Sequence, residues 1–199
     1  AASDVYKRQR TTTFKEKELI MKTGIEKFEN IMDADTCDLL IKHLEDNIHN
    51  SLDLNHSNKQ NVICREIMLQ PHTELDSMIF KPIEKVLGKY SEKYPYFRVR
   101  SDTGYQLRKI TGNTREHVDK NPEIEDNRNV SVIIGLNSDY EKGEFHFPFQ
   151  DYTTTVKRGE AIVFPVYFMY PHFVDEPIGN RYTINTCLLY TSDAADEWL

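Results

Sequence analysis

Apolar residues recur at helical spacing in the first half of the chain. Residues 25–48 read as a short strand followed by a helix, with Asp33 or Asp35 placed to cap the helix N-terminus. The buried stripe of this helix is predicted to consist of Cys37, Leu39, Leu40, Ile41 and Leu44. The pattern therefore predicts an amphipathic helix that packs against a core.

A second helical pattern occupies residues 73–94. Its apolar side consists of Leu75, Ile79, Ile83, Val86, Leu87 and Tyr90. Pro82 should either kink this helix or mark its real beginning, because proline cannot donate a backbone hydrogen bond. The segment between the two helices, residues 50–61, is polar, rich in asparagine and aperiodic, which favours a loop.

From Tyr96 onward the pattern changes to short runs typical of β-strands, separated by turn residues. These runs are YFRVRS, GYQLRKI, VSVIIGLN, GEFHFPF, TTTVK, EAIVFPV, YPHFVDEP and RYTINT. Many short strands at this spacing favour a sandwich or barrel over alternating strands and helices. The predicted class is α+β, with helices first and then an all-β core of jelly-roll type.

Composition and charge narrow the classes of function. A length of 199 residues suits one domain, and a formal net charge of -7 argues against nucleic acid as a partner. No run of 18 apolar residues predicts a membrane span, and no secretory signal pattern opens the chain. The three cysteines form no CxxC pair, so a reducing, cytoplasmic location is expected.

Both ends of the sequence resemble translated sequencing-adapter DNA. The segment CLLYTSDAADE can be encoded so that the opposite strand reads AASDVYKR, which is the start of the chain. We therefore expect residues 1–9 and 187–199 to be adapter-derived scars outside the fold. Residues 10–95 would form an N-terminal arm and supporting helices, and residues 96–186 the catalytic core, both within one domain.

The polar segment TGNTREHVDK, residues 111–120, contains a histidine and an aspartate two positions apart, His117 and Asp119. On an extended strand such residues point to the same face, so both could bind one metal ion. A surface loop pair is the alternative, and the pair alone does not decide between them.

A later segment supplies two further candidates, His172 on a strand-like run and Arg181 at the start of the last strand. In a double-stranded β-helix the strand with His117 and Asp119 lies near a later strand that would carry His172. Two imidazoles and one carboxylate then form a facial triad, which suits non-haem Fe(II) because adjacent coordination positions stay open. The planar guanidinium of Arg181 matches a carboxylate with two parallel hydrogen bonds.

With these residues in place, the region from about Tyr105 to Thr186 resembles the Fe(II)- and 2-oxoglutarate-dependent dioxygenases of the prolyl 4-hydroxylase-like group. The resemblance is carried by the segments HVD, GEFHFP, VKRGEAIVFP, PHFVDEP and GNRYTINT, which follow the order of the family. It implies N-terminal helices packed on a double-stranded β-helix of the jelly-roll, cupin-like type.

The resemblance also implies roles for individual residues. His117, Asp119 and His172 would be the iron ligands, and Arg181 would anchor the far carboxylate of 2-oxoglutarate. Two further residues, Thr183 and Tyr105, are candidates for contacts with the co-substrate. The implied cofactors are Fe(II), 2-oxoglutarate and molecular oxygen, with ascorbate in a supporting role.

Two departures from the family pattern stand out. A tyrosine that contacts the co-substrate carboxylate in many relatives is replaced by Gly135, and the usual glycine pair before the E-x-x-F strand is Lys142-Gly143. A local basic cluster, formed by Arg98, Arg100, Arg108, Lys109 and Arg115, is ordinarily a solvated sheet face. Its functional interpretation is a rim that steers a carboxylate-bearing substrate to the iron.

The sequence therefore predicts an enzyme that hydroxylates an aliphatic C–H bond, in a prolyl residue of a peptide or protein or in a free amino acid. Three alternatives remain open: the same cofactors acting on a nucleobase, a metal- or ligand-binding β-helix domain without turnover, and a zinc hydrolase that uses the same triad. Expected partners are a peptide or small-molecule substrate, with no membrane and no nucleic acid.

Overall fold

The computed structural model describes residues 23–120 and 127–190. Within these ranges the helices are α1 (Ala34–Asp46) and α2 (Glu74–Lys93), with short 3₁₀ turns at Ile48–Asn50, His56–Asn58 and Pro148–Gln150. The strands are β1 (Glu26–Phe28), β2 (Leu52–Leu54), β3 (Val62–Met68), β4 (Ser101–Asp102), β5 (Gln106–His117), β6 (Arg128–Gly135), β7 (Glu141–Lys142), β8 (Phe145–Phe147), β9 (Tyr152–Thr154), β10 (Ala161–Pro165), β11 (His172–Val174), β12 (Pro177–Ile178) and β13 (Arg181–Leu189).

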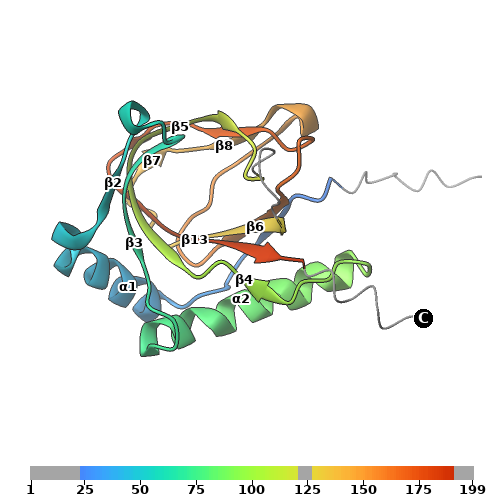
Figure 1. Cartoon of the computed structure of the whole chain (residues 1–199), viewed down its shortest axis with the longest axis horizontal. Coiled ribbons are helices and arrows are strands. Elements are labelled where there is room, and N and C mark those ends of the chain that lie inside the picture. The colour runs from blue at the N-terminus through green and yellow to red at the C-terminus, as the bar shows by residue number, and fades with distance from the viewer. Residues whose placement is uncertain (1–22, 121–126, 191–199) are drawn as a thin grey trace, which may run out of the picture.

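Most strands belong to one curled antiparallel sheet in the order β1-β10-β6-β13-β5-β11-β8-β9 (Figure 1). Strand β3 pairs with β5, β2 with β3, and β4 with β13, while β12 and β7 form a separate pair. Except for the consecutive strands β8 and β9, neighbours in this order are separated in the sequence by other strands, so most of the sheet is not built from simple hairpins. The sheet is antiparallel and compatible with the predicted jelly-roll core.

The two predicted helices are present, with two corrections of detail. Asp33 caps α1, since its side chain accepts a hydrogen bond from the Thr36 amide at 2.8 Å, but Leu39 is exposed and not part of the buried stripe. Helix α2 begins after Thr73 and continues through Pro82. Pro82 therefore does not mark the start of the helix. It lies in the third turn, where it removes one backbone donor.

Buried side chains form two main clusters. One contains Leu40 and Leu44 of α1, Ile79 of α2, and inward-facing strand residues such as Val132 and Ile184. The other lies within the curl of the sheet and contains Ile25, Ile133, Phe145, Phe147, Val156, Ile162, Phe164 and Val174. The site described below is built next to this second, aromatic cluster.

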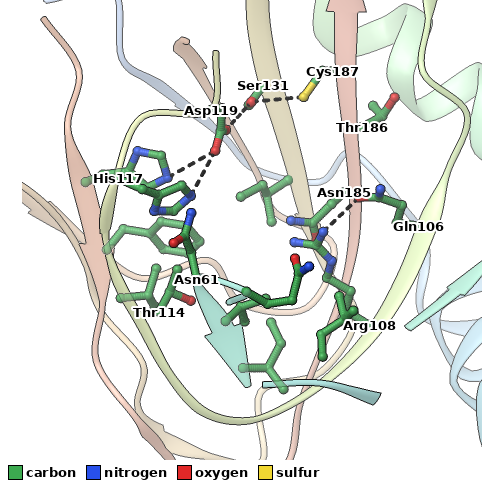
Figure 2. Close-up of a pocket in the computed structure, with 18 of the residues that line it drawn as sticks. Asn61, Gln106, Arg108, Thr114, His117, Asp119, Ser131, Asn185, Thr186 and Cys187 are labelled. Atoms are coloured by element: carbon green, nitrogen blue, oxygen red, sulfur yellow. Dashed lines mark hydrogen bonds and ion pairs between the residues drawn. The ribbon is translucent and has the colours of Figure 1, made fainter. Parts of the chain in front are cut away.

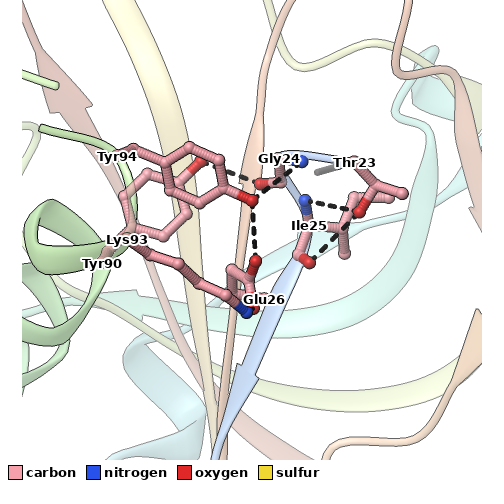
Figure 3. A network of polar contacts seen from close by, with 7 residues as sticks. All are labelled: Thr23, Gly24, Ile25, Glu26, Tyr90, Lys93 and Tyr94. Carbon is pink, nitrogen blue, oxygen red and sulfur yellow. Dashed lines mark hydrogen bonds and ion pairs between the residues drawn. The ribbon is translucent and has the colours of Figure 1, made fainter. Parts of the chain in front are cut away.

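A polar network joins α2 to the segment that leads into β1 (Figure 3). The Tyr90 hydroxyl donates to the carbonyl of Gly24 at 2.8 Å, and the Gly24 amide donates to the Tyr94 hydroxyl at 3.1 Å. Tyr94 in turn donates to Glu26 Oε1 at 2.7 Å, and Glu26 also pairs with Lys93. These contacts tie the edge strand β1 to the helix.

Three features depart from the pattern read from the sequence. Strand β3 was not predicted, and residues 111–117, for which the sequence left a strand and a loop open, complete β5 by pairing with β3 and β11. Residues Cys187–Leu189 continue β13 and pair with β6 and β4, so the expectation that they lie outside the fold is wrong. This pairing bears on their place in the fold and not on their origin. Residues 1–9 and 191–199 are outside the described ranges.

No helix in residues 23–120 and 127–190 combines the length and the apolar character needed to cross a membrane.

Candidate active site

Two histidines meet where β5 and β11 pair. His117 is the last residue of β5, and His172 opens β11 directly opposite it. The two rings lie 4.4 Å apart between centroids. Asp119 follows two positions after His117, past the end of the strand, so its carboxylate turns back toward both rings. Residues 55 positions apart are thus brought together by one strand pair.

The three side chains converge on one point. His117 Nε2 lies 3.1 Å from Asp119 Oδ1, and His172 Nε2 lies 3.7 Å from the same oxygen. All three ligand atoms lie within 4.8 Å of one another, the only such group found in the described part of the chain. Adjacent ligands on a metal with bonds of about 2.1 Å lie about 3 Å apart, which this spacing approaches.

Hydrogen bonds to each ligand fix the atom that it presents. The Nδ1 atoms of His117 and His172 lie 2.9 Å and 3.2 Å from the carbonyl oxygens of Arg115 and Tyr170. A carbonyl only accepts, so Nδ1 carries the proton and Nε2 keeps a free lone pair. Asp119 Oδ2 accepts a hydrogen bond from the Ser131 hydroxyl, which leaves Oδ1 directed at the histidines.

Burial and mutual charge shift the pKa values of the three groups. Burial lowers the pKa of His172. Burial acts in the same direction on His117, but the hydrogen bond and charge of Asp119 outweigh it, so the net pKa of His117 is raised. For Asp119, burial raises the pKa, and hydrogen bonds and charges from His117, His172 and Ser131 reverse this and hold it well below its usual range. Asp119 is therefore a carboxylate at neutral pH, as a metal ligand must be.

Arg181 is buried in the same region without an acidic partner. It is 2% exposed, and Nη1 donates a long 3.4 Å hydrogen bond to the Gly143 carbonyl, while Nε has no partner among the described residues. Its guanidinium stacks over the Phe145 ring at 5.0 Å. Burial lowers the pKa of Arg181 to about 10. A buried cation of this kind is costly unless an anion joins it.

A cavity of about 820 Å³ contains the triad and reaches Arg181. Its apolar wall includes Ile110, Ile133, Phe145 and Val174. In Figure 2, His117, Asp119 and Ser131 occupy one side of the cavity, and Arg108, Gln106 and Asn185 occupy the other. The cavity is thus polar at both ends and apolar between them.

The two weaker candidates for co-substrate contacts do not line this cavity. Thr183 is fully buried, and its hydroxyl donates to Asn185 Oδ1 at 2.7 Å. Tyr105 lies in the main core, where its hydroxyl donates to Asp102 at 3.0 Å. The roles assigned to them from the resemblance stay predictions.

Gly135 leaves no room for the side chain that many relatives have there. A Cβ atom at this position would lie 2.4 Å from the Lys157 carbonyl oxygen and 2.6 Å from that of Val156. The local backbone therefore has no space for a tyrosine at this position. The neighbourhood of Arg181 contains Tyr140 instead, and the ring of Tyr140 and the side chain of Arg181 both lie beside Gly143.

Three polar lining residues were missed or undervalued in the sequence. Ser131 is a polar residue between two valines in the apolar part of β6, and Asn185 shares the strand face of Arg181 by period-two spacing. Both residues could therefore have been identified from the sequence. Arg108 was grouped with surface cations, because its placement in the cavity depends on the curl of the sheet.

The residues present fit both groups that the resemblance implied. The donor set of two neutral imidazoles and one carboxylate suits Fe(II). The buried guanidinium of Arg181, which has no carboxylate partner among the described residues, suits the distal carboxylate of 2-oxoglutarate, which would supply the missing negative charge.

Comparisons with known proteins agree with this site. Residues 105–188 match the model of the 2OG-Fe(II) oxygenase superfamily. No curated protein sequence matches the chain. Among solved structures, a prolyl-4-hydroxylase from Pseudomonas putida is similar with a TM-score of 0.68 at 14% identity, covering 85% of this chain and 94% of that one.

Two further solved structures have similar scores. A viral collagen prolyl hydroxylase from Paramecium Bursaria Chlorella virus-1, in a 2OG complex, has a TM-score of 0.67 at 16% identity and covers 84% of this chain and 97% of that one. A prolyl hydroxylase from Trichoplax adhaerens, in complex with a hypoxia inducible factor peptide fragment, has a TM-score of 0.67 at 13% identity, with 84% of each chain covered.

The resemblance inferred from the sequence is confirmed by the match over residues 105–188 and by the shared fold. The prediction of a 2-oxoglutarate- and Fe(II)-dependent dioxygenase, an oxidoreductase that uses molecular oxygen, is also confirmed.

Proposed function

From the match of residues 105–188 to the 2OG-Fe(II) oxygenase superfamily as premise, we propose that this chain hydroxylates an aliphatic C–H bond of a prolyl residue in a peptide or protein, or of a free amino acid. One observation carries the proposal: a two-histidine, one-carboxylate group and a buried arginine without a carboxylate partner line the same cavity.

Different residues of the chain position the metal ion and the co-substrate. His117 and His172 present Nε2, and Asp119 presents Oδ1, each held by a hydrogen bond on its other polar atom. Arg181 holds the far end of the co-substrate, so that its keto acid end points to the triad. Apolar residues between these groups, including Ile133 and Phe145, exclude water from the reacting atoms.

Bound Fe(II) and 2-oxoglutarate, with molecular oxygen, supply the oxidising chemistry: one oxygen atom enters the substrate C–H bond as a hydroxyl group, and the other enters succinate as carbon dioxide is released. Because this reaction needs open coordination positions, a ligand set of three side chains is suitable and a closed set of four would not be.

The prolyl substrate is supported by the neighbours, which are named as prolyl hydroxylases, one of them in complex with a peptide fragment. The cavity of about 820 Å³ extends beyond the triad and Arg181 to Leu54 of β2 and Val62 of β3, which leaves space for a substrate beside the co-substrate. The finer features of the proposal are a double-stranded β-helix that carries the site with the helices packed on it, a cytoplasmic location, and no nucleic-acid partner.

Binding without turnover is the alternative from a different class. In that case the triad would bind a metal, and Arg181 would contribute nothing to 2-oxoglutarate. The full burial of Arg181 beside the cavity favours the enzyme, because a cation without a binding role is costly at that position.

The test is anaerobic addition of Fe(II) and 2-oxoglutarate, followed by the visible charge-transfer band of the chelate. His172→Ala should abolish the band, whereas Arg181→Ala should mainly raise the 2-oxoglutarate concentration needed to form it. Admitting oxygen should release succinate. A wild-type protein that stays colourless and forms no succinate contradicts the proposal.

A further inference from the structure

A second guanidinium lines the cavity, and the proposed chemistry does not use it. Arg108 lies on β5 directly opposite Thr183 of β13, and the next pair on the same face is Ile110 and Arg181. Cross-strand partners lie about 5 Å apart at Cβ, so Arg108 is one step along the ladder from Arg181. The two cations therefore line adjacent parts of one wall.

Arg108 is held in place from two sides. Its Nε donates to Glu66 Oε2 at 2.6 Å, and Nη2 donates to Gln106 Oε1 at 3.0 Å. Guanidinium has five N–H groups, so three of them have no partner among the described residues. Glu66 fixes the plane of the group and leaves its outer edge, Nη1 and one N–H of Nη2, available for a ligand.

The surroundings of Arg108 suit a polar, anionic group. Figure 2 shows Gln106 and Asn185 beside Arg108, across the cavity from His117 and Asp119. Among the described residues that line the cavity, Asp119 supplies the only carboxylate, whereas the cations are Arg108, Lys120, Arg128 and Arg181. Asp119 belongs to the metal-binding triad, so nothing acidic in the lining competes for the outer edge of Arg108.

Depth separates Arg108 from the co-substrate position. Arg181 is 2% exposed, whereas the Arg108 side chain is 21% exposed. A dicarboxylate bound deep in the cavity has one distal carboxylate, and the fork of Arg181 can take both of its oxygens. Arg108 therefore lies closer to solvent than Arg181 does.

A cross-strand ion pair with Glu66 is the purely structural interpretation, since Glu66 and Arg108 are direct partners in the β3–β5 pair. That pair would be satisfied equally well by lysine. It does not explain why the remaining donors of a planar fork face a cavity lined by carboxamides.

We propose that Arg108 is a substrate-specificity residue that binds a carboxylate of the substrate, with Gln106 and Asn185 as polar neighbours. This inference rests on the proposed function, because it assigns the substrate class of the same site. The carboxylate has two sources: the α-carboxylate of a free amino acid, or an acidic side chain beside the hydroxylated residue in a peptide.

The experiment measures binding, not turnover, by anaerobic calorimetry on protein loaded with Fe(II) and 2-oxoglutarate. Two matched pairs of probes separate the sources. L-proline is compared with L-prolinamide, and a blocked peptide with Glu next to Pro is compared with its Gln counterpart. In the wild type, the carboxylate member of at least one pair should bind about tenfold more tightly.

Two variants assign that preference to a residue. Arg108→Gln should remove the preference while the affinity for 2-oxoglutarate stays within about twofold. Lys109→Gln is the matched control: it removes a neighbouring positive charge that pairs with Glu45, outside the cavity lining, and should keep the preference. If Arg108→Gln fails to fold because Glu66 is left unpaired, the double variant Glu66→Gln/Arg108→Gln takes its place.

Equal affinity within both probe pairs overturns the inference, as does the absence of binding by every probe. A preference that survives in Arg108→Gln also overturns it, as does a loss of affinity confined to 2-oxoglutarate. The chelate band of the wild type is recorded on the same samples. A normal band without any carboxylate preference leaves the proposed function intact and removes only the role of Arg108.

Discussion

At the scale of single residues, Arg181 is the side chain whose placement is hardest to explain without a ligand. The residue is almost fully buried, its Nε is unpartnered in the described structure, and burial lowers its pKa to about 10. Protein interiors rarely keep such a charge unless it serves binding. The energetic cost at this position is therefore a measurable sign of function.

Replacing Arg181 by methionine should stabilise the ligand-free protein. Removing a buried cation without an acidic partner should increase the free energy of unfolding by about 1–3 kcal/mol, measured by urea denaturation. Adding 2-oxoglutarate to the metal-loaded protein, at a concentration that saturates the wild type, should then raise the stability of the wild type by about 2–3 kcal/mol and that of the variant by less.

Arg65→Met, at an exposed ion pair with Asp53, is the control. Its free energy of unfolding should differ little from that of the wild type, both without and with 2-oxoglutarate. A large loss of stability in ligand-free Arg181→Met would show that the protein itself satisfies this guanidinium.

The triad gives a pH dependence of metal binding with a defined sign. His117 must lose its proton to bind a metal, and Asp119 holds the pKa of His117 above its usual 6.5. Protons therefore compete with the metal below that raised pKa, and affinity should fall up to about tenfold per pH unit as the pH decreases.

His172, whose pKa is lowered by burial, should add to this competition only at more acidic pH. Co(II) titrations followed by absorbance between about pH 6 and pH 8 test the dependence. An affinity that is flat across this range would show that His117 is not a ligand.

At the scale of elements, the end of β6 packs so closely against the backbone of Val156 and Lys157 that residue 135 has no space for a side chain. Gly135 pairs with Thr183, while its α-carbon faces the carbonyls of Val156 and Lys157. Strand β6 can approach these two carbonyl groups this closely only because residue 135 has no Cβ atom.

Gly135→Ala should therefore destabilise the fold by about 1–3 kcal/mol or more, since a Cβ atom would overlap backbone that cannot move aside. Gly88→Ala is the matched control in α2, where a Cβ atom meets nothing within 4 Å and alanine favours the helix. Thermal melting of both variants measures the difference. Equal melting temperatures for the two would contradict the close approach at Gly135.

Periodicity was a sufficient guide to some elements and not to others. Both helices and most core strands could be predicted, because their apolar residues repeat at 3.6 or 2.0 positions and Asp33 supplies a cap. The polar end of β5 could not be predicted as a strand, because its conformation comes from pairing with β3 and β11 and not from its own residues.

The triad could be predicted for a different reason from the fold. His117 and Asp119 carry a local signal, and the ordered segments around His172 and Arg181 identified the family. Tyr105 had no such signal, and the structure places it in the core beside Asp102. The position of Arg108 in the cavity depends on how the strands curl, which no local pattern specifies.

At the scale of the whole molecule, β13 connects the site to the rest of the sheet. It pairs with β5 along one edge and β6 along the other, and its far end pairs with β4. Arg181 opens this strand, and Leu188, 3% exposed, packs into the main core near its end. The residues after Thr186 are therefore part of the structure that holds Arg181 in place.

A chain that ends at Thr186 should be less stable than one that ends at Tyr190. The shorter chain loses the ladder of Cys187–Leu189 and the burial of Leu188, which together should cost about 2–5 kcal/mol. Urea denaturation of the two chains gives this difference directly. Because β13 also carries Arg181, the shorter chain should bind 2-oxoglutarate more weakly even where it remains folded. Equal stability of the two chains would show that residues 187–190 make no contribution to the fold, whatever their origin.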